Sequence, residues 1–131
     1  MHTRLIWLLF AQGIYPLLVY HLLVPKNASE GDTIELVCDY DLGKDSLYVF
    51  KMYKDNTEFY RYIPLSVEKK QEFPLEGINL QLAKCTENSI TLSKISNATT
   101  GNFTCEVSVE ESFETAPMVK ELIVRSKNLI A

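Results

Sequence analysis

Apolar and polar residues alternate along most of the chain in short runs bounded by turn-forming residues. Ile34, Leu36 and Cys38, for example, share one side of such a run. A period of two residues is typical of half-buried β-strands, and no segment keeps the spacing of a helix for long. We expect strands at 33–38, 47–53, 58–63, 78–82, 89–95, 101–109 and 118–124. Many short strands a turn apart predict an all-β sandwich or a β-barrel.

The same alternation predicts which side chains face the core. In 47–53, one side carries Tyr48, Phe50 and Met52, and the other carries Val49, Lys51 and Tyr53. In 101–109, the outward positions are Thr104, Glu106 and Ser108. A turn precedes 58–63, and the sequence leaves two registers open for that run, one residue apart. A shift by one residue would exchange its two faces.

Two cysteines favour the sandwich over a ligand-carrying barrel. Cys38 and Cys105 lie at inward positions of strands far apart in the chain, so in an exported protein they read as a disulfide between two facing sheets. Closing so long a loop stabilises a fold by about 4 kcal/mol. The interval also leaves room for extra strands, which predicts a variable-type (V-type) immunoglobulin-like β-sandwich of two antiparallel sheets. Cys85 is left over, either as an exposed or half-buried free thiol or as a bridge to another chain.

The N-terminus has the pattern of a secretory signal peptide. Arg4 precedes the apolar run 5–10, and small residues follow at 11–13, so we expect residues 1–13 to be removed. A membrane anchor is the alternative, because apolar residues continue to Val24. Three sequons agree with export and predict glycosylation at Asn27, Asn97 and Asn102. The product is expected to be secreted, with no stable membrane insertion.

Length and charge narrow the function. A chain of 131 residues has room for one domain, at 14–125 with a tail at 126–131. A net charge of -4 without a basic cluster makes nucleic acid an unsuitable partner. The two histidines and the absence of nucleophile and phosphate-binding motifs indicate no catalytic site, no metal site and no cofactor. The remaining classes are a protein-recognition module and a secreted defence or ligand-carrier protein.

Several segments together resemble the first immunoglobulin domain of the beaten-path proteins. The most specific are Lys51-Met52-Tyr53-Lys54 and the segment 58–64, Glu-Phe-Tyr-Arg-Tyr-Ile-Pro, with support from 38–42, 45–48, 77–78 and 105–108. The resemblance covers about Leu18 to Val124. It implies a neuronal, extracellular protein that acts in axon guidance by binding an immunoglobulin-superfamily receptor of the sidestep group. Met52 replaces the family's tryptophan, and Phe103 lacks the hydroxyl of the corner tyrosine.

The recognition face of such a domain is expected on the sheet that holds the strands 47–53, 101–109 and 118–124 together with the extra strands. Tyrosine and arginine are frequent anchors at interfaces, so Tyr53 and Arg61 are the leading candidates. The full predicted set is Lys51, Tyr53, Phe59, Tyr60, Arg61, Tyr62 and Glu106. The alternative is that 58–63 supplies only core rings and a solvated, salt-bridged face, with Lys51 and Glu106 as a simple cross-strand ion pair.

Overall fold

The computed structural model describes residues 17–112 and 114–127, and the predicted signal peptide at 1–13 lies outside them. The strands follow the chain in the order β1 (Leu18–Leu23), β2 (Ala28–Ser29), β3 (Ile34–Asp41), β4 (Leu47–Lys54), β5 (Thr57–Tyr62), β6 (Lys70–Glu72), β7 (Ser89–Leu92), β8 (Gly101–Val109), β9 (Thr115–Leu122) and β10 (Val124–Arg125). Two 3₁₀ turns, η1 (Leu82–Lys84) and η2 (Asn97–Thr99), lie between them. In the described part of the chain, no helix has the length and apolar character needed to cross a bilayer.

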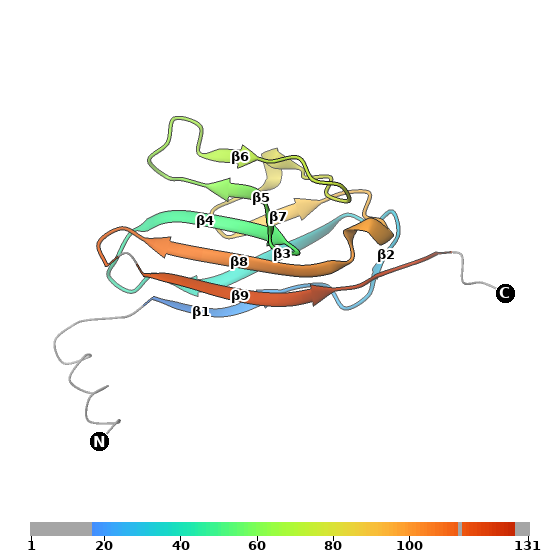
Figure 1. Ribbon diagram of the computed structural model, residues 1–131, viewed down its shortest axis with the longest axis horizontal. Helices are drawn as coiled ribbons and strands as arrows, with labels where there is room; N and C mark the ends of the chain where they lie inside the picture. Colours follow the sequence, from blue (N-terminus) through green and yellow to red (C-terminus); the bar gives the residue numbers. More distant parts are fainter. Residues whose placement is uncertain (1–16, 113, 128–131) are drawn as a thin grey trace, which may run out of the picture.

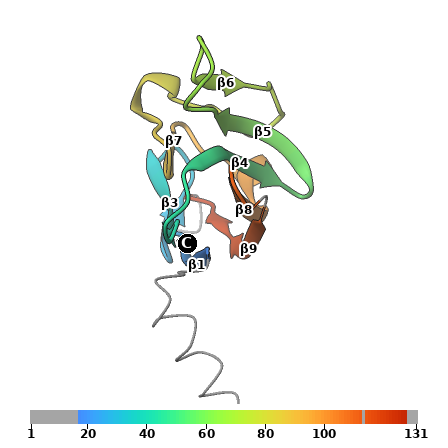
Figure 2. The same cartoon turned by 90° about the vertical axis from the view of Figure 1, so that its left-hand side faces the viewer.

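The strands form two facing layers (Figures 1 and 2). One layer is a five-stranded antiparallel sheet in the order β6-β5-β4-β8-β9, and the other contains the antiparallel sheet β1-β3-β7. A short parallel pair, β10-β2, lies at one end. The addition of β5 and β6 to the β4-β8-β9 sheet is the arrangement of a V-type immunoglobulin domain. The predicted all-β V-type sandwich is therefore confirmed.

A disulfide between Cys38 of β3 and Cys105 of β8 joins the two layers, as predicted. Met52 lies in register with Cys105 and is buried beside it, so a flexible thioether occupies the interior at this point. The Phe103 ring is also buried and packs edge-to-face on Phe59, with ring centroids 5.9 Å apart. Phe103 thus contributes ring packing at the position where the corner hydroxyl is missing.

Some predicted strand limits were wrong for local reasons. The segment 78–82 makes only an isolated bridge between Leu80 and Leu92 before η1 begins. The predicted strand 89–95 ends at Leu92, and Lys94 has a positive φ of 46°, which a pleated strand does not accommodate. Tyr48 was expected in the core, but the register between β4 and β8 shifts at this residue and leaves it 56% exposed.

Cys85 is fully buried in the hydrophobic core, which corrects the expectation of an exposed or half-buried thiol. Its Sγ donates a hydrogen bond to the Gln81 carbonyl oxygen at 3.3 Å. Burial raises the pKa of this thiol. A bridge from Cys85 to another chain would therefore require the core to open.

Candidate recognition surface

Four of the predicted residues come together on the outer face of the five-stranded sheet. Lys51 of β4 lies in register with Glu106 of β8 on one side and with Arg61 of β5 on the other. Tyr53 is two residues further along β4 and therefore faces the same way. All four side chains are partly exposed. They form a cross-strand surface, which we call the sheet face.

The other three predicted residues do not belong to the sheet face. Phe59 and Tyr60 are both fully buried, so their assignment to a partner-binding surface is corrected. A bulge in β5 explains this, because Met52 pairs with Tyr60 whereas the next residue, Tyr53, pairs with Glu58. The extra residue turns two consecutive rings inward. Tyr62 pairs with Phe50 and packs half-buried against the core.

The bulge also brings Glu58 and Arg61 to the same side of the sheet. The Arg61 Nε and Nη2 donate to the two carboxylate oxygens of Glu58 at 2.8 and 2.7 Å. The Arg61 guanidinium lies over the Phe73 ring, 5.1 Å from its centroid. The hydrogen bond to Glu58 raises the pKa of Arg61. Arg61 is therefore held in place before any partner arrives, with 30% of its side chain still exposed.

Tyr53 and Glu106 make a second polar contact on the sheet face. The Tyr53 hydroxyl donates to Glu106 Oε1 at 3.0 Å. Partial burial, together with this bond and the nearby carboxylates, raises the pKa of Tyr53 to about 12. The hydroxyl is thus a neutral donor at physiological pH. Glu106 is engaged by Tyr53, and among the described residues no salt bridge joins it to Lys51, although the two lie opposite each other in the register.

Sequence patterns missed two members of this surface, Glu58 and Phe73. The position of Glu58 beside Arg61 could not be predicted, because the bulge that creates it has no distinctive sequence signal. Phe73 follows β6, which contains no hydrophobic alternation, and its backbone N–H bonds the Phe59 carbonyl oxygen at 2.9 Å. Only the pairing of β6 with β5 reveals that Phe73 lies beneath Arg61.

Loops at one end of the sandwich border the sheet face. The Asp45 carboxylate, between β3 and β4, accepts the backbone N–H groups of Glu111 and Ser112 at 2.9 and 3.0 Å and the Ser112 hydroxyl at 3.0 Å. These bonds lower the pKa of Asp45 to about 2, the bond from Glu111 having the largest effect. The ionised carboxylate therefore ties together two loops that are far apart in the sequence (Figure 1).

The three predicted glycosylation asparagines, Asn27, Asn97 and Asn102, are all exposed. They lie at the end opposite to the Asp45 loops. Asn102 is the second residue of β8 and meets the β4–β5 turn, where its backbone N–H donates to Asp55 Oδ1 at 3.0 Å. Asn97 begins η2, just before β8, and Asn27 precedes the β2–β10 pair at the same end. Attached sugars at these positions would leave the Asp45 loops uncovered.

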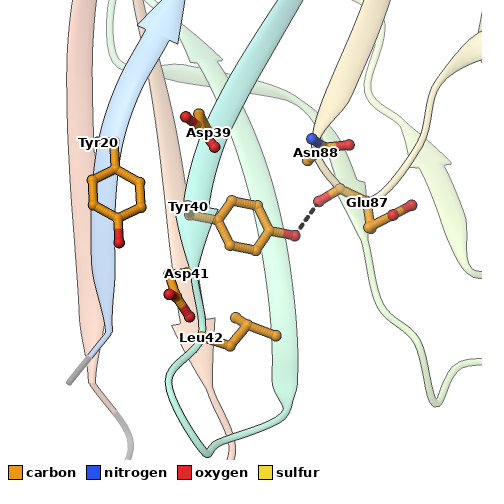
Figure 3. A pocket seen from close by; sticks show the side chains of 7 residues that line it. All are labelled: Tyr20, Asp39, Tyr40, Asp41, Leu42, Glu87 and Asn88. Atoms are coloured by element: carbon orange, nitrogen blue, oxygen red, sulfur yellow. Dashed lines mark hydrogen bonds between the residues drawn. The ribbon is translucent and has the colours of Figure 1, made fainter. Parts of the chain in front are cut away.

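A hollow of about 530 Å³ lies on the β1–β3–β7 side, away from the sheet face (Figure 3). Tyr20 of β1 and Tyr40 of β3 contribute rings, and Asp39, Asp41 and Glu87 contribute carboxylates. The Tyr40 hydroxyl donates to the Glu87 carbonyl oxygen at 2.6 Å, which connects β3 to the loop before β7. The hollow is open and its lining mixes rings with carboxylates, which does not favour a purely apolar cargo.

No protein-family model matches the sequence, and no curated protein matches it. Solved structures do resemble the fold. Murine CEACAM1b superposes with a TM-score of 0.64 at 18% identity, covering 85% of this chain and 54% of that one. This chain therefore spans about half the length of that neighbour.

Three further solved structures resemble this chain. The V domain of amphioxus IgVJ-C2 has a TM-score of 0.60 at 16% identity, over 76% of this chain and 98% of its own. Murine CRIg has a TM-score of 0.59 at 10% identity, over 87% and 100%. A structure of the mouse coronavirus receptor-binding domain complexed with its murine receptor also matches, with a TM-score of 0.60 at 18% identity and coverage of 85% and 54%. At these identities the likeness establishes the immunoglobulin-like fold.

Proposed function

We propose that this chain is an extracellular recognition module of the beaten-path type, which binds a sidestep-like immunoglobulin-superfamily receptor through the sheet face. It acts by protein contact, without catalysis. The observation that carries the proposal is the gathering of Lys51, Tyr53, Arg61 and Glu106 on one partly exposed sheet surface.

The chemistry of the sheet face suits protein docking. Two basic residues, Lys51 and Arg61, are balanced by two acidic ones, Glu58 and Glu106. The Glu58–Arg61 and Tyr53–Glu106 contacts already satisfy much of their bonding capacity. A partner can therefore cover Glu58 and Arg61 without isolating either of these two charges, which would be costly. The ring of Tyr53 supplies rigid contact area at its centre.

The beaten-path resemblance points to the same strands. Its two most specific segments, 51–54 and 58–64, coincide with β4 and β5. Within them Phe59 and Tyr60 build the core, whereas Lys51, Tyr53 and Arg61 build the surface. The complex of the mouse coronavirus receptor-binding domain with its murine receptor supports the use of this fold in protein recognition.

The test is a binding screen of the secreted chain against purified immunoglobulin-superfamily ectodomains, including sidestep-like receptors. Tyr53→Ser should weaken the complex by about tenfold or more, as expected for a central aromatic anchor. Tyr20→Ser is the matched control, because Tyr20 is an exposed tyrosine on the other sheet. Binding of sugars or lipids alone, with no receptor captured, would instead support a secreted defence or carrier protein.

A further inference from the structure

We propose that the docking surface extends from the sheet face onto the adjoining loop end, where Leu65 and Val67 enter an apolar pocket with a basic rim on the partner protein. This inference rests on the proposed recognition function and adds the chemistry of the partner. The loop end comprises residues 41–46, 63–69, 110–112 and 114.

The register of the strands places these loops at the same end of the sheet. Leu47 at the start of β4 pairs with Val109 at the end of β8, and Phe50 pairs with Tyr62 at the end of β5. The loops that precede β4, follow β5 and follow β8 therefore leave the sheet at the same end (Figure 1). The β5–β6 loop continues directly from the strand that carries Arg61, so it borders the sheet face.

Two aliphatic side chains protrude from the β5–β6 loop. Leu65 is 82% exposed and Val67 is fully exposed. Two backbone hydrogen bonds hold this segment in a turn. The Ser66 N–H donates to the Ile63 carbonyl oxygen at 3.1 Å, and the Ile63 N–H donates to the Lys69 carbonyl oxygen at 2.8 Å. Exposed apolar residues on an ordered loop are suited to fill a pocket in a partner.

The charge of the loop end as a whole predicts the rim of the pocket. The loop end carries six carboxylates, from Asp41, Asp45, Glu68, Glu110, Glu111 and Glu114, and two lysines, Lys44 and Lys69. This acidic excess repels the anionic surface of a lipid bilayer and attracts a protein surface rich in lysine and arginine. The three sequons lie at the opposite end of the sandwich, so glycans there would leave the loop end uncovered, and a glycan on Asn102 would cover only the part of the sheet face nearest to that end.

The test measures the affinity of the receptor identified by the ectodomain screen for three variants of the full secreted chain. Leu65→Ser combined with Val67→Ser should weaken the complex by about tenfold or more, because the apolar contact area is lost. Ile123→Ser is the matched control, since Ile123 is equally aliphatic, 55% exposed and located near the sequon end. Tyr53→Ser reports the sheet face separately. Thermal unfolding should be nearly unchanged in the loop-end and control variants.

Salt and lipid measurements test the charge assignment. Raising NaCl from about 50 mM to about 300 mM should slow association, because it screens the attraction between the acidic loops and a basic rim. Vesicles of phosphatidylcholine and phosphatidylserine should not retain the chain, and retention that the loop-end serines abolish would overturn the inference in favour of a membrane contact. An association rate that does not depend on salt would rule out a basic rim around the partner's pocket.

The two proposals fail in different ways. If a receptor binds and Tyr53→Ser weakens it but the loop-end serines do not, this inference is overturned and the recognition function stands. If no immunoglobulin-superfamily receptor binds, the proposed function fails and this inference fails with it.

Discussion

Glu58 and Arg61 point to the same side of the five-stranded sheet although they are three residues apart in one strand. In a regular strand this spacing places two side chains on opposite faces. The bulge at Phe59 and Tyr60 inserts one additional residue and restores a common face. One local irregularity therefore supplies the core with two rings and the surface with a preorganised arginine.

A double-mutant cycle should detect the Glu58–Arg61 contact. We expect Glu58→Ala, Arg61→Ala and the double variant to give a coupling free energy of about 0.5–1 kcal/mol, since the pair is bidentate but partly solvated. Urea unfolding measures the change in the free energy of unfolding for each of the three variants. High salt should reduce the coupling. A coupling of zero at low salt would show that Phe73 alone positions the guanidinium.

Core and surface aromatics should respond differently to truncation. Phe59→Ala removes a buried ring that packs against Phe103, so we expect a loss of about 3–5 kcal/mol in the free energy of unfolding. Tyr53→Ala removes one hydrogen bond on a half-exposed face and should cost about 1 kcal/mol. Denaturant titrations compare the two. Similar small losses for both would place Phe59 on the surface, as the sequence pattern first suggested.

Much of the fold was predictable because period-two alternation survives in the long strands. Ile34, Leu36 and Cys38 are buried as expected, and the inward Cys105 meets Cys38. The prediction failed where pairing with a neighbour, rather than hydrophobic alternation, makes the strand. β6 has the sequence Lys-Gln-Glu and exists because it pairs with β5. β1 was not predicted, because it lies in an apolar stretch that continues from the predicted signal peptide.

The sheet face was predictable only where the register is regular. Lys51, Tyr53 and Glu106 follow simple alternation on β4 and β8, and the structure places them on the expected side. On β5, alternation cannot reveal an inserted residue, so the inward rings and the outward arginine could not be separated. The loop end depends on contacts between distant segments, such as Asp45 with Ser112, for which the sequence carries no local signal.

The disulfide should be required for a stable fold. Cys38→Ser or Cys105→Ser opens the link between the layers, and we expect a loss of about 2–5 kcal/mol together with poor secretion. Cys85→Ala is the matched control, because it removes the buried free thiol and leaves the bridge intact. Secretion yield and thermal unfolding measure both effects. Normal yields of a folded, monodisperse Cys38→Ser protein would show that packing alone holds the sheets together.

The Asp45 carboxylate should make the loop end sensitive to acid. Its pKa is lowered to about 2 in the folded protein from an ordinary value of 3.8, so its stabilising effect is complete above about pH 4. As the pH falls from 4 to 2, protonation removes the charge that the Glu111 and Ser112 N–H groups bond, and the stabilisation is lost. Asp45→Asn should flatten this part of the stability profile. At neutral pH it should also accelerate hydrogen exchange at the amides of residues 111 and 112, while exchange in β8 stays slow. Equal exchange rates in the variant and the natural protein would show that the two loops are held together without this carboxylate.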